Sequence, residues 1–217
     1  MDGAALIGKI ATYLTLVFAI TVHEWAHAWS ADRCGDPTAR LLGRLTLNPF
    51  AHMDLIGTVI IPLYALLAPG GIALIGWGRP VPINAANFRH DARDDILVSL
   101  AGPFSNLVTT LVALLLVRLL LFVHHSLAVT AIVYILLPLA GLSFFLAFFN
   151  LLPIPPLDGS HLVRAWLNLD ARQVYDRLAG FGFIVLLILI NTPLWSVFAR
   201  AIGAAYAVVR GVFFLPV

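Results

Sequence analysis

The sequence predicts an all-α polytopic membrane protein with about five to six transmembrane helices. Of its 217 residues, 61% are hydrophobic and only 11% are charged, whereas soluble domains are about 45–50% apolar and about 25% charged. The apolar residues form segments long enough for membrane helices, without the alternation typical of a membrane β-barrel. The single cysteine, Cys34, allows no internal disulfide, and no basic, aromatic-rich patch indicates nucleic-acid binding.

The first predicted span, from about Ala4 to Trp29, ends in the sequence His23-Glu24-Trp25-Ala26-His27. On a helix the two histidines lie one turn apart on one face, so both can reach one zinc ion, with the glutamate beside them as general base. Glu24 is the only glutamate in the chain. A signal peptide is the competing interpretation, but cleavage at Ala26-His27-Ala28 would split the motif.

The segment between the first span and the next long one is expected to be irregular. We predict a short strand at residues 44–47. The apolar stretch from Leu55 to Leu67 is short for a full crossing, and Pro69-Gly70-Gly71 interrupts the apolar sequence after it. We therefore expect residues 55–78 to form a re-entrant hairpin or two short crossings. Two prolines favour extended chain at residues 78–84.

Two long spans follow, and each carries a distinctive sequence. Ile96 to Val123 contains Gly102-Pro103-Phe104-Ser105-Asn106 near its start. Leu127 to Asn150 is followed by three prolines between residues 153 and 156, which stop the helix and leave Asp158 on extended or irregular backbone. Such backbone is tolerated at membrane depth only where it is buried in protein or lines a watery cavity.

The placement of arginine predicts the orientation in the membrane. The connections 31–55, 79–95 and 160–177 hold nine of the thirteen Lys and Arg residues, and the short breaks at 124–126 and 191–193 hold none. By the positive-inside rule, the three arginine-bearing connections lie in the cytoplasm. We therefore expect a multi-pass protein of the inner (plasma) membrane, with the His-Glu-x-x-His sequence toward the cytoplasmic face.

On this map, polar residues of three segments converge a little inside the cytoplasmic face, and such convergence in a membrane indicates a site. A catalytic zinc has three protein ligands and one open position. We expect His23 and His27 to supply two ligands. Asp158 is the candidate third ligand, and His161 is the alternative third ligand. If Asp158 does not bind the metal, it would serve to form the turn before Gly159. One zinc ion per chain is expected.

Three further residues are candidates for the catalytic step. Glu24 would take a proton from water, whose pKa zinc lowers toward about 7, and pass it to the leaving amine. Asn106 or Asn150 would hydrogen-bond the oxyanion or hold the substrate backbone. Each asparagine could instead have a structural role. Asn106 would then hydrogen-bond a neighbouring helix, and Asn150 would cap the proline-rich loop.

These motifs resemble the site-2 protease family of intramembrane zinc metalloproteases. The resemblance rests on His23-Glu24-x-x-His27, then Gly102-Pro103-x-x-Asn106, then Asn150-x-x-Pro153-x-Pro155-Pro156-Leu157-Asp158-Gly159, and covers about residues 20–165. It implies that the two histidines and the aspartate bind zinc, that the glutamate is the base, and that the asparagines act on the substrate. It also implies that residues 79–84 help to present an extended substrate strand. Unlike in many relatives, we expect no PDZ or nucleotide-sensing domain in this sequence.

We therefore expect residues 1–217 to form a single membrane-embedded metalloprotease domain, with a catalytic core at about residues 4–165 and two accessory spans at about 178–214. The expected activity is hydrolysis of peptide bonds in or near transmembrane segments of other membrane proteins, as in regulated intramembrane proteolysis. The expected partners are those substrates and the lipid bilayer. The alternative is a non-catalytic zinc-containing scaffold or partner-binding protein. A metal transporter is disfavoured because the candidate ligands lie at one depth.

Overall fold

The structure is a computed structural model that describes residues 3–67, 76–123 and 126–214, and these described residues contain helices but no strand. Four of the described helices are long and apolar enough to cross a membrane, and a bent helix pair gives a fifth if it counts as one span. The predicted all-α polytopic fold class is confirmed. The predicted reversal at Pro69-Gly70-Gly71 lies outside the described residues, as does most of the break at 124–126.

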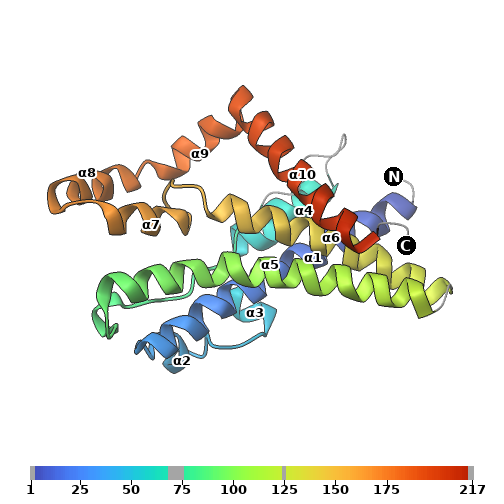
Figure 1. The fold of residues 1–217 in the computed structure, drawn as a ribbon, viewed down its shortest axis with the longest axis horizontal. Coiled ribbons are helices and arrows are strands. Elements are labelled where there is room, and N and C mark those ends of the chain that lie inside the picture. Colours follow the sequence, from blue (N-terminus) through green and yellow to red (C-terminus); the bar gives the residue numbers. More distant parts are fainter. Residues whose placement is uncertain (1–2, 68–75, 124–125, 215–217) are drawn as a thin grey trace.

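Three long helices form the centre of the molecule (Figure 1). They are α1 (Gly3–Cys34), α5 (Asp91–Val123) and α6 (Leu127–Asn150), and each packs against the other two. Their shared core is built largely from alanine and leucine. Small side chains such as alanine let membrane helices approach closely. Where α5 meets α6, the Thr110 hydroxyl donates to the Ala140 carbonyl across 3.1 Å.

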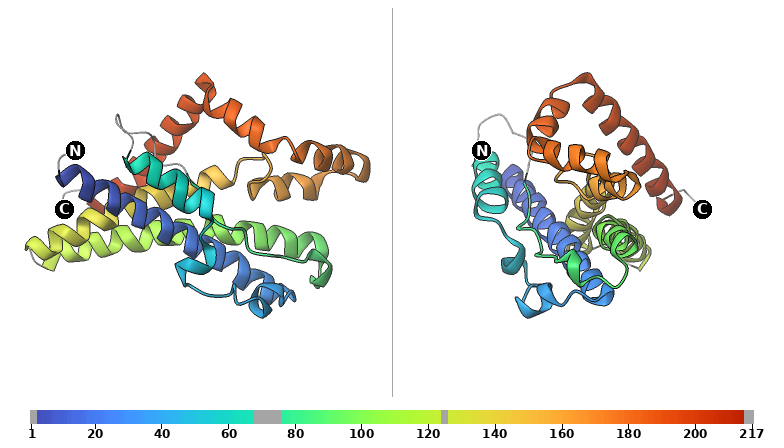
Figure 2. Two further views of the ribbon diagram at one scale, coloured as in Figure 1. Left: turned by 180° about the vertical axis from the view of Figure 1, so that it is seen from behind. Right: turned by 90° about the vertical axis from the view of Figure 1, so that its left-hand side faces the viewer.

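The chain between α1 and α5 wraps around one side of α1 (Figure 2). The predicted strand at residues 44–47 is wrong, because this stretch forms bends and its backbone pairs with no neighbouring strand among the described residues. Residues 78–84 form no helix, in agreement with the extended chain predicted there, but Met53 and Gly78 make only an isolated antiparallel bridge. Pro80 and Pro82 have no N–H to continue a ladder. The short helical elements here are α2 (Thr38–Leu41), α3 (Pro49–His52), η1 (Leu55–Ile60), α4 (Ile61–Leu67) and η2 (Ala85–Asn87).

The C-terminal part contains four helices, α7 (Gly159–Trp166), α8 (Leu169–Ala179), α9 (Gly182–Ile190) and α10 (Pro193–Phe214). The polar connection predicted at residues 160–177 is thus mostly helical. Helices α8 and α9 are bent by 68° at their junction. Helix α10 returns to pack on α5 and α6, and the two described ends of the chain lie at the same end of the molecule (Figure 1).

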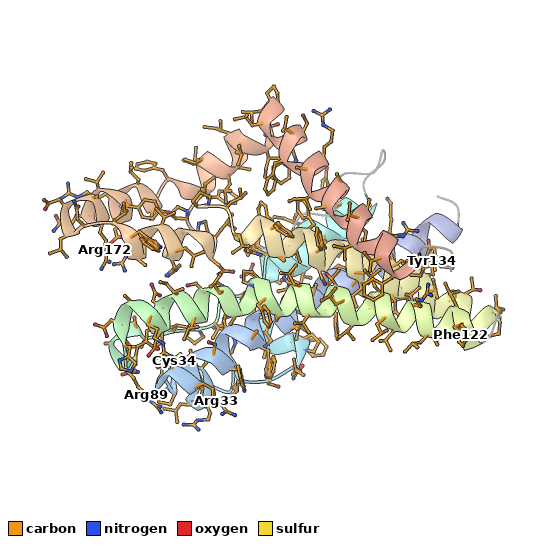
Figure 3. All side chains as sticks on the ribbon, viewed as in Figure 1. Arg33, Cys34, Arg89, Phe122, Tyr134 and Arg172 are labelled. Atoms are coloured by element: carbon orange, nitrogen blue, oxygen red, sulfur yellow. The ribbon has the colours of Figure 1, made fainter. Side chains whose placement is uncertain are left out.

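Arginines from the three cation-bearing connections lie toward one end of the molecule. Figure 3 shows Arg33, Arg89 and Arg172 toward one end of the molecule, with Phe122 and Tyr134 at the other. At the arginine-bearing end, the Arg89 backbone N–H donates to the Cys34 carbonyl over 3.1 Å. The fold therefore gathers cationic connections at one end of the bundle, which is the distribution on which the predicted orientation depends.

Candidate metal centre

The structure brings together the three side chains predicted to bind a metal. His23 and His27 lie one turn apart on α1, and Asp158 lies on the turn that leads into α7. The two Nε2 atoms are 3.1 Å apart. His23 Nε2 lies 3.2 Å from Asp158 Oδ2, and His27 Nε2 lies 3.3 Å from Asp158 Oδ1. Both histidines are buried, so the cluster is enclosed by protein.

These distances fit a tetrahedral zinc ion. With zinc–ligand bonds of about 2.0–2.2 Å, ligand atoms on a tetrahedron lie about 3.3–3.5 Å from one another. The three observed separations are within a few tenths of an ångström of this ligand–ligand distance. Two imidazoles and one carboxylate form a donor set that zinc accepts with a fourth position open. Among the described residues, no other group of three or more His, Cys, Asp or Glu side chains has this arrangement.

The second ring nitrogen of His27 fixes which nitrogen is free for a metal. Its Nδ1 lies 2.7 Å from the Val98 carbonyl. A carbonyl only accepts, so Nδ1 carries the proton and donates, and Nε2 keeps its lone pair toward Asp158. Such a hydrogen bond to the outer nitrogen is the usual support of a metal-binding histidine.

Asn106 lies beside the Nδ1 atom of His23, as the Val98 carbonyl lies beside the Nδ1 atom of His27. It is fully buried, and the side-chain atom placed as Nδ2 lies 3.1 Å from His23 Nδ1. The nitrogen and oxygen ends of an amide are assigned from hydrogen bonding. Only the orientation with Oδ1 accepting from Nδ1–H leaves His23 Nε2 free to bind a metal. The predicted Asn106 thus contacts a candidate ligand.

Gly102 explains why α5 can come so close to these histidines. A Cβ atom at this position would lie 2.6 Å from His23 Cε1 and 2.7 Å from His23 Nε2, and it would overlap His27 Nε2. Only a residue without a side chain permits that approach. The predicted Gly-Pro-x-x-Asn sequence therefore contributes through both its first and its last residue.

Glu24 lies between the two histidines on α1, and its carboxylate is anchored. Its Oε2 accepts a hydrogen bond of 2.9 Å from the Val81 backbone N–H, in the extended segment that passes along α1. A hydrogen bond from an amide to a carboxylate is charge-assisted and stronger than one between neutral groups. The side chain expected to move protons is thus held by a distant part of the chain.

The remaining candidates have other partners. The Asn150 amide donates to the Leu146 carbonyl over 3.0 Å, within its own helix. His161 Nδ1 lies 3.1 Å from Asp95 Oδ1, and this bond, which raises the pKa of His161, directs the ring toward α5. Among the described residues, the candidate metal group includes Asp158 and not the alternative third ligand, His161.

Sequence reasoning missed two parts of this site. It assigned no contact to the buried Arg44, which hydrogen-bonds the backbone of the extended segment, and it did not anticipate the Val98 carbonyl beside His27. Arg44 is the first residue of the stretch predicted as a strand at residues 44–47. A backbone carbonyl carries no signal in the sequence.

Comparisons with known proteins identify relatives over most of the chain. The family described as "Peptidase family M50" matches residues 119–191. "Putative zinc metalloprotease YwhC" of Bacillus subtilis (strain 168) is 38% identical over 186 residues, which are 84% of this chain and 81% of that protein. No solved structure matches.

Two mycobacterial proteins are also similar. "Putative zinc metalloprotease Rip2" of Mycolicibacterium smegmatis is 30% identical over 177 residues, which are 82% of this chain and 65% of that protein. Rip2 of Mycobacterium tuberculosis (strain H37Rv) is 32% identical over 175 residues, 81% of this chain and 64% of that protein. The chain therefore spans slightly less than two thirds of these longer relatives.

Proposed function

Because this chain belongs to peptidase family M50, the zinc metalloproteases of the site-2 protease type, we propose that it hydrolyses peptide bonds in or near transmembrane segments of other membrane proteins. The observation that carries the proposal is the convergence of His23, His27 and Asp158 beside Glu24, inside a bundle of membrane-length helices. In this proposal, one zinc ion binds to the two Nε2 atoms and the Asp158 carboxylate.

When bound, zinc would act as a Lewis acid that polarises the peptide carbonyl and makes water acidic enough to be deprotonated near neutral pH. Glu24 is the proposed general base and acid. It accepts the proton of the attacking water and delivers it to the departing amine, which restores its charge. The Val81 N–H holds one carboxylate oxygen and leaves the other for proton transfer.

The surrounding residues position these groups. Asn106 and the Val98 carbonyl hold the outer nitrogens of the two histidines. Asn150 bonds the Leu146 carbonyl within its own helix, so contact with the substrate stays a prediction for this residue. A substrate helix uses its own peptide groups in hydrogen bonds, so it has to unwind locally before a peptide bond can be attacked.

We also propose that the protein lies in the inner (plasma) membrane with this site toward the cytoplasmic face. The support is the arginine distribution of the sequence together with the position of Arg33, Arg89 and Arg172 toward one end of the molecule (Figure 3). Helices α2, α7 and α8, from the cation-bearing connections, lie toward that same end (Figure 1).

The test compares wild type, Glu24→Gln and Asp32→Asn in proteoliposomes with a model transmembrane substrate. Glu24→Gln keeps the shape of the side chain but removes the base, so we expect cleavage to fall about 10²-fold to 10⁴-fold with bound zinc unchanged. Asp32→Asn is the matched control, because it makes the equivalent change on the same helix. Equal cleavage by Glu24→Gln and wild type would refute the proposed mechanism, whereas no cleavage by wild type with zinc bound would favour the zinc-containing scaffold.

A further inference from the structure

We infer that Arg44 is a positioning residue for the general base, acting through the peptide group between Pro80 and Val81. Its guanidinium holds the carbonyl side of this segment so that the Val81 N–H fixes the Glu24 carboxylate. The inference rests on the proposed role of Glu24 and extends it to Arg44, a residue for which no catalytic role was predicted.

Val81 has the single backbone N–H group in the sequence between Arg79 and Ile83. The sequence reads Arg79-Pro80-Val81-Pro82-Ile83, and neither proline has an N–H group. Val81 therefore supplies the one amide donor between Arg79 and Ile83. That donor points at Glu24 Oε2 over 2.9 Å, and the Val81 side chain is buried with Ala28 and Ala39.

Arg44 binds the opposite face of the same backbone. Its Nη2 donates to the Arg79 carbonyl over 2.7 Å and to the Pro80 carbonyl over 3.4 Å. The Pro80 carbonyl and the Val81 N–H belong to one peptide group, so a cation binds its oxygen end while a carboxylate binds its hydrogen end. Hydrogen bonds in such a chain polarise and strengthen each other.

The rest of the segment is held by backbone and hydroxyl contacts. The Arg79 N–H donates to the His52 carbonyl over 2.8 Å, and the Thr58 hydroxyl donates to the Trp77 carbonyl over 2.7 Å. Gly78 lies so close to α1 that a Cβ would press against Ile20. These contacts hold the segment near α1, and the Arg44 contacts are the ones adjacent to the Val81 amide.

Arg44 is an unusual residue to find in this environment. Its exposed fraction is 8%, and among the described residues it has no carboxylate ion-pair partner. Burial lowers the pKa of Arg44, and the charge of Glu24 acts in the opposite direction. A buried cation without an ion pair is costly to keep. A role in orienting the peptide group that holds Glu24 accounts for its presence.

The experiment is a kinetic cycle in proteoliposomes with four proteins: wild type, Arg44→Met, Glu24→Asp and the double variant. We expect Arg44→Met to lower kcat about 10-fold to 10²-fold, as a displaced catalytic group does, with KM, bound zinc and melting temperature close to wild type. Arg44→Lys should recover part of kcat, because an ammonium can still donate to a carbonyl. Arg40→Met is the matched control, since Arg40 is exposed on the same connection and pairs with Asp32.

The double variant tests the route of the effect. Glu24→Asp shortens the side chain and removes it from the Val81 N–H, so adding Arg44→Met should cause little further loss. Multiplied losses in the double variant, a wild-type kcat in Arg44→Met, or a change in KM alone would overturn the inference. Failure of the proposed function looks different, because wild type would then not cleave the substrate, or Glu24→Gln would cleave it as fast as wild type.

Val81→Pro provides a second variant that leaves the buried arginine in place. It removes the N–H donor from a segment that is already extended and flanked by prolines. If Arg44→Met does not fold, Val81→Pro carries the test: a loss of kcat similar to that expected for Arg44→Met supports the inference, and a wild-type kcat overturns it.

Discussion

Replacing Gly102 with alanine should disable the candidate metal centre without straining the backbone of α5. Gly102 lies inside a helix and is not among the described glycines with positive φ. Judged by backbone preference alone, alanine in a helix is more stable than glycine by about 0.5–1 kcal/mol. Any loss of metal binding or stability would therefore come from the added methyl group.

The size of the effect follows from the contacts. The new Cβ would lie 2.6 Å from His23 Cε1 and 2.7 Å from His23 Nε2, whereas carbon atoms pack at about 3.5–4.0 Å. The ring, or the whole of α5, has to move by roughly 1 Å, and zinc ligands hold their distances within about 0.2 Å. We expect zinc affinity to fall by at least about 10²-fold, or about 2.8 kcal/mol. Overpacking adds about 1–3 kcal/mol of destabilisation, more than the helix preference returns.

The assay is zinc content per chain after equilibration in chelator-buffered zinc, with melting temperature measured on the same samples. Gly203→Ala is the matched control, because a Cβ at that position in α10 meets no atom within 4 Å. Wild-type zinc affinity in Gly102→Ala would refute both the close approach of α5 and the assignment of the two histidines as ligands.

Three further predictions address other contacts. Asn106→Leu should lower zinc affinity about 10-fold to 100-fold by removing the support of His23 Nδ1, measured by chelator competition; wild-type affinity would contradict that support. Removing metal with a chelator should abolish cleavage by wild type and lower its melting temperature, and added zinc should restore both. The melting temperature of His23→Ala should respond little to the chelator. An equal response in the two proteins would place the stabilising metal elsewhere. Burial raises the pKa of Asp36, but hydrogen bonds from Thr38, Asn84 and Asn87 outweigh it and leave the pKa below its ordinary value. The stability that Asp36 contributes is thus present above its unfolded pKa of about 3.9 and is lost as pH falls through its lower folded pKa. The melting temperature of wild type should therefore exceed that of Asp36→Asn by less below about pH 4. A difference in melting temperature that does not change with pH would contradict this.

The parts of the fold predicted well are those with a local signal. The long apolar runs of α5 and α6 are visible because a membrane helix must be apolar along its whole length. The pairing of His23 and His27 follows from helix periodicity, and the end of α6 follows from the prolines after it, although Asp158 itself has helical backbone angles at the start of α7. The helical stretch α8 was missed because its polar composition was interpreted as a connection.

The parts that failed or were missed depend on distant partners. The predicted strand at residues 44–47 had suitable residues, but a strand also needs a neighbour with free N–H groups, and Pro80 and Pro82 remove them from the extended segment. The Arg44 contacts to that segment and the Val98 carbonyl beside His27 join positions far apart in the sequence. No periodicity or composition marks such contacts, since the backbone atoms that make them are common to all residues.

The division of the candidate site between α1 and the turn before α7 has a consequence for biosynthesis. The histidine pair is among the first parts of the chain to leave the ribosome, whereas the proposed third ligand follows only after α5 and α6 have been made. Synthesis at about 5–20 residues per second separates these events by several seconds. During that interval the nascent chain holds two histidines without the carboxylate, so the proposed zinc site can be completed only after α5 and α6 have been made.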